Sequence, residues 1–376
     1  MSKIAGIYWD TSSVGGIATE ADNFRRVATA AGDTFHVIRC PCHKTSKIEI
    51  YDTPQMIRGG DTWIAVDGTA SHHPNRVAET VKFLEENYDA IIFIFPCPHA
   101  TKAYGNVPYF LPLYTDTILL PKMMRILDAY WSTYADWGTE AAQYCDSIVV
   151  NQAAYAEPLK GTPLEDKLVI VPKPFSPFST DPSLKDPHLL VWPNQWKAIK
   201  GIKPFLKTIP DLPELWRIEL YSCGIEYYQL RTTVAWQLAV WDDHFKDFSA
   251  FGRANYYGYV TLEEMAVAYT RAAVTVDFQG HAVKYDAYRS GSYNNTTVEA
   301  LYYGALPILH EQARKSIIPD ELFLTVSDPL DIVQLNWKEV SNTAMDITRR
   351  KRARQWVMDT HSAEKVWTIL KEKLGL

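Results

Sequence analysis

Two kinds of segment alternate along the chain: short runs of β-branched and aromatic residues, and longer stretches whose apolar residues recur every three or four positions. In the first half, the short runs predict strands at residues 3–9, 34–40, 89–95, 109–114 and 147–151. The stretches between them predict helices near residues 17–31, 75–87, 121–133 and 137–144. Strands that alternate with helices are typical of parallel βαβ units, so the pattern predicts an α/β fold.

Residues 172–187 interrupt this alternation. The segment holds five prolines and no sustained periodicity, as expected of a linker between two domains. The pattern then restarts, with strands predicted at residues 188–193, 217–223, 256–260, 273–278, 306–310 and 322–326, and a long helical stretch over 348–374. We therefore expect two doubly wound α/β domains, in which ligands bind at the carboxyl ends of the strands.

Length and composition agree with this division. The chain has 376 residues and 47% hydrophobic residues, enough for two packed cores. It contains no run of about 18 apolar residues, and its start, "MSKIAGIYWD", has no basic leader. We expect a soluble, cytoplasmic protein without a membrane partner. The formal net charge of −6 argues against a protein that coats nucleic acid, but leaves a local basic groove open.

The cysteine content predicts reduced thiols, because an odd number of cysteines in a long chain is not a disulfide framework. The five are Cys40, Cys42, Cys97, Cys145 and Cys223. "CPCH" at 40–43 with the histidines at 72–73 is one arrangement to weigh as a zinc site. A single Cys-x-Cys pair favours loop and core thiols instead, so we predict no metal site.

Three loops that follow predicted strands carry candidate binding residues. In the first, Gly15 and Gly16 precede a predicted helix, where missing side chains let backbone N–H groups approach an anion. The spacing matches neither G-x-G-x-x-G nor the P-loop, and a tight strand-to-helix turn explains it equally well. In the second, Lys197, Lys200 and Lys203 lie three apart, suited either to a diphosphate or to a solvated lysine face.

The third loop, over residues 280–295, is longer than usual for a βα connection, which favours a binding loop. It leads into "NNTTVEALYYG", which predicts a helix with Asn or Thr at its cap and Gly304 at its end. Glu299 then falls in or just after the first turn. Such a carboxylate can accept two ribose hydroxyls while the helix start binds a phosphate; the alternative is a partner for the helix dipole.

The segment "NNTTVEALYYGALPIL" resembles the E-A-x-x-x-G-x-x-P signature of retaining, nucleotide-sugar-dependent GT-B glycosyltransferases. Further segments are similar to that superfamily's other landmarks, in the usual order, so the resemblance covers nearly the whole chain: "GGIATEADNFRRVATAAGDTFHVI", "KGIKPFL" and "YYGYVTLEEMAVAYTRAAVTVDF". Within the superfamily, W-K-x-x-K-G at 196–201, "MAVAYTRAAVTVDFQG" and "LPLYTDTILL" resemble the DNA α-glucosyltransferases of bacteriophages.

The resemblance implies a GT-B fold, with two Rossmann-like doubly wound domains facing a cleft. Residues 1–175 would bind the acceptor and residues 176–350 the nucleotide sugar. Residues 351–376 would form a C-terminal helix that packs back on the first domain. The donor implied is a UDP-sugar such as UDP-glucose, and no metal ion is required. The acceptor implied is a hydroxymethylated pyrimidine in phage DNA, which places the protein in the host cytoplasm if a phage encodes it.

The resemblance also implies roles for individual residues of the second domain. Glu299 matches the carboxylate that holds the nucleotide ribose. Thr296 and Thr297 fall where backbone and hydroxyl groups meet the diphosphate, and Lys200 matches the lysine that stabilises the departing nucleotide. The backbone around Tyr259 and Val260 would recognise the edge of the base.

In the first domain, Gly15 and Gly16 match the loop that closes over the phosphates. Asp116 matches an acidic position near the acceptor hydroxyl, whose proton a carboxylate takes as the glycosidic bond forms. The sequence also departs from the family. Gly291 and Asn294 stand where a second acidic residue is common, and Gln195 replaces an arginine, so Lys197 or Arg289 would supply the missing charge.

Three alternative functions and two features with two possible explanations each stay open. The same fold suits a glycan or small-metabolite acceptor, an epimerase that needs no acceptor, or a binding module with a decayed site. The 22 tyrosines and 12 tryptophans suit either a base taken out of the DNA stack or ordinary cores. The basic run "RRKRAR" at 349–354 suits either DNA phosphates or a charged helix face.

Overall fold

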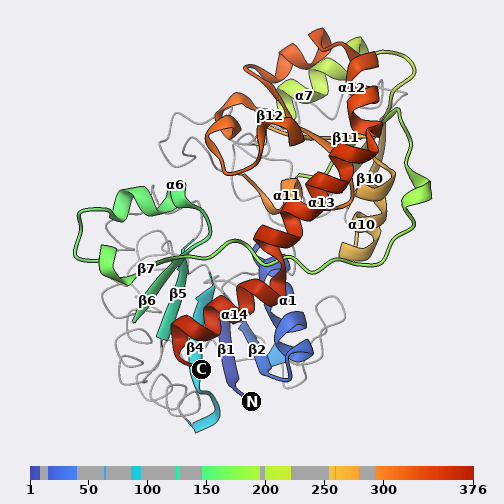
Figure 1. Ribbon diagram of the computed structural model, residues 1–376. Helices are drawn as coiled ribbons and strands as arrows, with labels where there is room; N and C mark the ends of the chain where they lie inside the picture. Colours follow the sequence, from blue (N-terminus) through green and yellow to red (C-terminus); the bar gives the residue numbers. More distant parts are fainter. Residues whose placement is uncertain are drawn as a thin grey trace, which may run out of the picture. The chain divides into compact units, whose positions relative to one another are not determined.

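A computed structural model describes residues 1–8, 16–39, 63–64, 86–94, 123–127, 146–194, 200–221, 254–258, 260–278 and 293–376. The chain divides into two units (Figure 1). Residues Met1–Ser176 and His361–Leu376 form the first, and Pro177–Thr360 form the second. The strand expected at 109–114, the helix expected at 137–144 and most of the helix expected at 75–87 lie outside the described residues.

The first unit is built on one parallel sheet. In the described part of the chain its strands follow the order β3-β2-β1-β4-β5-β6-β7. Their bounds are β1 Lys3–Tyr8, β2 Thr34–Arg39, β3 Trp63–Ile64, β4 Ala90–Ile94, β5 Met123–Leu127, β6 Ser147–Val150 and β7 Leu168–Ile170. The α-helices with described bounds are α1 Gly16–Ala30, α6 Ala153–Ala156 and α14 Ala363–Leu374.

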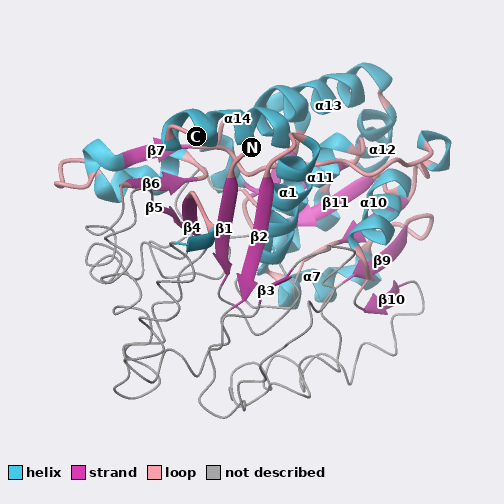
Figure 2. Ribbon diagram, turned by 90° about the horizontal axis from the view of Figure 1, so that it is seen from below, coloured by secondary structure: helices cyan, strands magenta, loops and turns pink. Residues whose placement is uncertain are grey.

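Helices α1 and α14 supply much of the first unit's core (Figure 2). Phe24 of α1 and Trp367 of α14 are nearly fully buried, and their ring centroids lie 6.3 Å apart. Phe35 of β2 packs against both rings. The last helix of the chain therefore packs with α1 in the core of the first unit.

The second unit has strands β8 Leu189–Trp192, β9 Arg217–Tyr221, β10 Ala254–Gly258, β11 Val274–Asp277, β12 Leu306–His310 and β13 Leu324–Val326. Its α-helices are α7 Ile202–Thr208, α10 Leu262–Arg271, α11 Asn295–Tyr302, α12 Trp337–Met345 and α13 Ile347–His361. All strand pairs are parallel, in the order β10-β9-β8-β11-β12-β13. In chain order this is 3-2-1-4-5-6, the Rossmann arrangement, whose switch point lies between β8 and β11.

The predicted helix over 121–133 is wrong where the structure describes it, because Met123–Leu127 form β5. The segment "MMRIL" is rich in helix formers, but it pairs with β4 on one side and β6 on the other. Tertiary pairing outweighs local helix propensity here. The short strands β3 and β7 were not predicted, since each offers only two or three residues of pattern.

The expected helical stretch over 348–374 is two helices, α13 and α14, with Ser362 between them. Ser362 has φ −48° and ψ 124°, and its segment pairs with Phe175, whose N–H donates to the carbonyl of His361 at 2.8 Å. The division between the units falls after Ser176 and after Thr360, rather than after the expected residues 175 and 350. All of α13 except His361 belongs to the second unit, where the buried Arg349 donates to the backbone carbonyls of Gly304 and Ala305.

None of the helices within the described residues is both long enough and apolar enough to cross a lipid bilayer.

Candidate functional site

Polar side chains gather at the carboxyl ends of β8 and β11, the switch point of the second sheet. Asn194 follows β8, Asp277 is the last residue of β11, and Asn294 is the N-cap residue of α11. Asn194 and Asp277 are buried and Asn294 is partly buried. The strands that precede Asn194 and Asp277 are mostly apolar. Open α/β sheets bind their ligands at this place, so these residues mark the candidate site.

Asp277 is the centre of the cluster and is only 6% exposed. Its Oδ2 atom accepts hydrogen bonds from Nδ2 of Asn294 at 2.5 Å and from the hydroxyls of Thr296 and Thr297 at 3.3 Å each. A carboxylate with several donors, placed at a helix N-terminus, is stabilised by both the hydrogen bonds and the helix dipole. Asp277 thus anchors the start of α11.

Asn194 joins the end of β8 to β11 and to α11. Its side-chain amide donates to the carbonyl of Val276 at 3.0 Å, and its Oδ1 atom accepts from the Thr296 hydroxyl at 3.3 Å. The indole N–H of Trp192 donates to the backbone carbonyl of Asn194 at 2.9 Å. The ends of β8 and β11 and the first turn of α11 are therefore joined by one hydrogen-bonded network.

Lys200 brings a positive charge to this network. Its Nζ atom donates to Oδ1 of Asn294 at 2.8 Å. The next residue, Gly201, adopts φ +73°, a conformation that favours glycine. A Cβ atom at Gly201 would also lie only 2.7 Å from Cβ of Phe278. Trp192 and Phe205 stack behind this turn with centroids 4.8 Å apart. The Lys-Gly pair is thus held between the aromatic core and the start of α11.

Helix α11 has the expected ends. Asn294 adopts extended N-cap geometry, and Gly304, at φ +83°, lies just beyond the last turn. Cδ of Arg350 would lie 3.0 Å from a Cβ atom at Gly304, so a larger residue would require this side chain to shift as well as a strained φ. Glycine at this position lets the chain leave the helix in a left-handed conformation.

Glu299 lies one turn into α11 and is half-buried. Tyr269 of α10, which is 1% exposed, lies close to it. Burial raises the pKa of the Tyr269 phenol well above its usual value, and the nearby charge of Glu299 raises the pKa further. The Tyr269 phenol therefore keeps its proton and stays neutral beside this carboxylate.

Val260 lies between the carboxyl end of β10 and the start of α10. Helix α10 starts directly afterwards with a capping box: Thr261 accepts from the N–H of Glu264, and Glu264 accepts from the N–H of Thr261. The position of Val260 is thus fixed by the helix that follows it.

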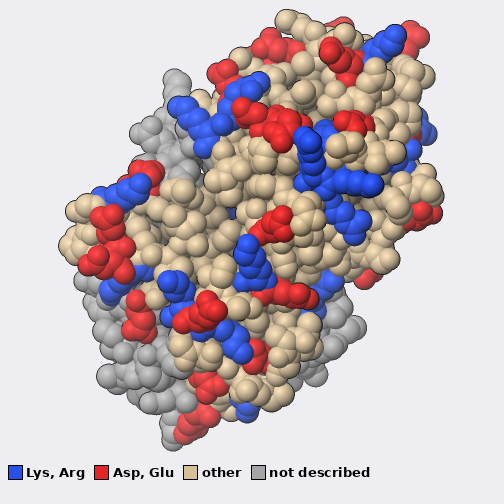
Figure 3. All heavy atoms as spheres, in the orientation of Figure 1, with Lys and Arg blue, Asp and Glu red and all other residues tan. Residues whose placement is uncertain are grey.

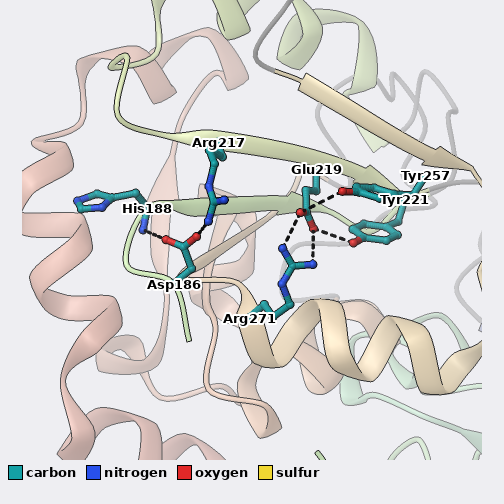
Figure 4. A network of polar contacts seen from close by, with 7 residues as sticks. All are labelled: Asp186, His188, Arg217, Glu219, Tyr221, Tyr257 and Arg271. Atoms are coloured by element: carbon teal, nitrogen blue, oxygen red, sulfur yellow. Dashed lines mark hydrogen bonds and ion pairs between the residues drawn. The ribbon is translucent and has the colours of Figure 1, made fainter. Parts of the chain in front are cut away.

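A second polar network lies between β9, β10 and α10 (Figure 4). Glu219 is 4% exposed and accepts from Nη2 of Arg271 at 2.9 Å, from the hydroxyl of Tyr221 at 2.7 Å and from that of Tyr257 at 3.4 Å. Both tyrosine rings stack with centroids 4.9 Å apart. Because the carboxylate has a cation and two phenols as partners, this network fastens α10 to the sheet.

The structure brings four of the expected site residues together at the start of α11 or on it: Lys200, Thr296, Thr297 and Glu299. Gly16 begins α1 in the first unit. Outside the described residues lie Gly15, Asp116, Lys197, Tyr259 and Arg289. Asn194 and Asp277 were missed. The sequence signal for Asp277 was an acidic residue that ends a strand of otherwise buried type, "AVTVD".

Within the described residues, no group of three or more His, Cys, Asp or Glu side chains is placed to hold a metal ion. The cysteines and histidines weighed as a zinc site, residues 40–43 and 72–73, lie outside that part of the chain.

No protein-family model matches the chain, and no curated protein sequence does. Solved structures do match over the whole length. One is an α-glucosyltransferase in complex with UDP-glucose and DNA containing an abasic site, with 9% identity, 100% coverage of both chains and a TM-score of 0.69. Another is HepE from Anabaena in complex with UDP-glucose, with 10% identity, 100% coverage of both chains and a TM-score of 0.68.

The chain has the GT-B fold. A third match, the sucrose-phosphate synthase of Thermosynechococcus elongatus, is 14% identical, with a TM-score of 0.68 and coverage of 99% of this chain and 98% of the synthase. Two parallel sheets, each in a separate unit, are what a GT-B fold requires, and the strand order of the second unit gives its Rossmann topology.

Proposed function

We propose that this protein is a retaining glycosyltransferase that takes its sugar from a UDP-sugar such as UDP-glucose. The observation that carries the proposal is the grouping of an ammonium, a helix N-terminus and a half-buried carboxylate within the second unit. Lys200 and the first turn of α11 suit a diphosphate, and Glu299, one turn along the same helix, suits the ribose hydroxyls. The backbone at Val260 would contact the base. The base, the ribose and the diphosphate of a nucleotide sugar then each have a partner, and only the sugar has none among these groups.

In this mechanism the departing UDP is stabilised by positive groups that are already in place. Lys200 and the N–H groups at the start of α11 face the charge that develops as the bond from sugar to phosphate breaks. Lys197 and Arg289 would add charge from outside the described residues, and Asp116 would take the proton of the acceptor hydroxyl. No protein nucleophile is needed if the departing phosphate assists the attack on the same face of the sugar.

For the acceptor, we propose a hydroxymethylated pyrimidine in DNA. The fold is similar to that of α-glucosyltransferases solved with DNA, among them one bound to UDP and a 13-mer containing an HMU base, with a TM-score of 0.68. The second candidate is a sugar or small-metabolite acceptor. It is favoured by the comparable TM-score to sucrose-phosphate synthase, 0.68, at a higher identity of 14%.

The test is to incubate the protein with UDP-sugars and with plain, hydroxymethylcytosine-containing or hydroxymethyluracil-containing DNA, digest the DNA and weigh the nucleosides. A mass gain of one hexose on one modified nucleoside supports the DNA acceptor. Donor binding without any gain on DNA moves the proposal to the second candidate. A new UDP-sugar formed without an acceptor would identify an epimerase.

The matched pair Glu299→Gln and Glu263→Gln tests the donor site. Glu263 is an exposed glutamate in the first turn of α10. Losing charge-assisted hydrogen bonds to the ribose should weaken UDP binding by about 10–100-fold for Glu299→Gln. Glu263→Gln should bind UDP as the wild type does. Equal affinities for both variants would remove Glu299 from the proposed site.

A further inference from the structure

The buried carboxylate of Asp277 lies beside the groups of the proposed donor site, although it would repel a diphosphate. It is 6% exposed, ends β11 at the switch point and is joined through Asn294 to the ammonium of Lys200. We propose that Asp277 is a positioning residue: it sets the orientation of the Asn294 amide, and that amide holds Lys200 where the departing diphosphate needs its charge. This inference rests on the proposed use of a UDP-sugar.

The chemistry of the three groups allows only one orientation of the central amide. An ionised carboxylate only accepts hydrogen bonds and an ammonium only donates them. Asn294 therefore turns Nδ2 towards Asp277, at 2.5 Å, and Oδ1 towards Lys200, at 2.8 Å. A flipped amide would set its NH2 group against the ammonium and its oxygen against the carboxylate. Asp277 thus keeps an acceptor facing Lys200.

The same carboxylate also orders the first turn of α11. The hydroxyl of Thr297 donates to Oδ2 of Asp277 at 3.3 Å, and that of Thr296 shares its single proton between this atom and Oδ1 of Asn194, each at 3.3 Å. The N–H groups at the start of a helix lack partners within the helix and suit an anion. Three donors and the positive end of the helix dipole offset the repulsion between Asp277 and a diphosphate.

The experiment is a double-mutant cycle between Asp277→Asn and Lys200→Met, measured as kcat and KM for UDP-glucose turnover. A carboxamide at 277 offers a donor as well as an acceptor, so it no longer enforces the Asn294 orientation. Thr275→Val is the matched control, because Thr275 is a buried polar residue on the same strand, 3% exposed, outside the cluster.

We expect Asp277→Asn to lower kcat by about 10–100-fold with little change in the donor KM, because the lost interaction acts on the departing charge. In the Lys200→Met background the same change should lower kcat by less than about threefold, since coupled residues are not additive. A merely structural role would lower the melting temperature and give equal factors in both backgrounds. Equal factors would overturn the proposal.

Asn294→Leu keeps the test decisive if Asp277→Asn fails to fold. It breaks the link while leaving Asp277 and both threonines in place, and it should reproduce both the kcat loss and the lack of additivity with Lys200→Met. Full kcat in Asn294→Leu would overturn the proposal. Calorimetric titration of the wild type with UDP distinguishes failure of the proposed donor site from failure of this inference. Absence of UDP binding would reject the donor site and the inference with it. UDP binding together with additive effects of the variants would reject the inference alone.

Discussion

The ammonium of Lys200 and the side-chain carbonyl of Asn294 are 2.8 Å apart, and their hydrogen bond joins the turn before α7 to the N-cap of α11. The two residues are far apart in the sequence, yet both follow strands at the switch point of one sheet. The ammonium of Lys200 is therefore held at the start of α11, where the N–H groups of the helix also attract anions.

The first prediction concerns this cation. Lys200→Met should lower kcat for sugar transfer by about 10²–10³-fold, because it removes a charge that faces the departing diphosphate. Lys207→Met is the matched control, since Lys207 is exposed in the last turn of α7. Its kcat should equal that of the wild type. Steady-state transfer assays with saturating UDP-glucose check both, and equal loss in the two variants would contradict a role specific to Lys200.

The second prediction concerns the turn that carries Lys200. Gly201 and Gly161 have almost the same φ, +73° and +72°, but a Cβ atom at Gly201 would lie 2.7 Å from Cβ of Phe278, whereas nothing lies within 4 Å at Gly161. Gly161→Ala should cost about 1 kcal/mol of strain. Gly201→Ala adds a clash inside a packed aromatic core, so it should cost about 1–3 kcal/mol more.

Thermal unfolding of the two alanine variants measures the difference. We also expect Gly201→Ala, but not Gly161→Ala, to weaken UDP binding, because Phe278 and Gly201 must move apart and Lys200 moves with the turn. Similar melting temperatures for the two variants would show that the turn adapts without strain.

The sequence predicted the fold class, most strands and the start and end of α11, because periodicity and cap residues are local signals. The signals for α11 were its run of Asn and Thr residues and Gly304. The prediction of a helix where β5 lies was wrong for the opposite reason. The segment "MMRIL" is a strand because it pairs with β4 and β6, and the local sequence pattern does not reveal that pairing.

The candidate site divides in the same way. Lys200, Thr296 and Glu299 could be chosen from motifs and from a resemblance. Asp277 and Asn194 could not, because their importance comes from hydrogen bonds to residues 17 to 102 positions away along the chain. An isolated Asp at a strand end has no spacing that marks it as the centre of a cluster.

The third prediction concerns the basic run on α13, over which Lys and Arg side chains gather (Figure 3). Its members differ in environment. Arg349 is 5% exposed and donates to five backbone carbonyls, the shortest contact being 2.9 Å to Gly304. Arg354 lies over the ring of Tyr302. Lys351 and Arg352 are exposed.

Arg349→Met should therefore destabilise the second unit by about 2–3 kcal/mol, because it leaves buried carbonyls without donors. Arg352→Met, the matched control on the same helix, should change the stability by less than about 0.5 kcal/mol. Urea unfolding followed by tryptophan fluorescence compares them. A stability loss of the same size in Arg352→Met would mean that the exposed residues of the basic run also stabilise the second unit.

The last prediction concerns the pH dependence of the first unit's stability. Asp33 is buried, and its carboxylate accepts from Lys371 at 2.7 Å, from the indole N–H of Trp367 at 3.1 Å and from the N–H of Ser2 at 2.8 Å. These contacts tie α14 to the loop before β2. They make Asp33 the charged partner on which the docking of the last helix depends.

Burial raises the pKa of Asp33, but the hydrogen bonds from Lys371, Ser2 and Trp367 outweigh burial and lower the pKa from 3.8 to about 2. A depressed folded-state pKa stabilises the fold above the unfolded-state value, and this stabilisation is lost as the pH falls from about 4 through about 2. Asp33→Asn cannot titrate, so its stability should fall less steeply than that of the wild type across this window. Urea unfolding at pH 5, 4, 3 and 2 measures both slopes. Parallel slopes would show that Asp33 is no better solvated by its partners than by water, and that α14 is held by its apolar packing, to which Val366, Trp367 and Leu370 contribute.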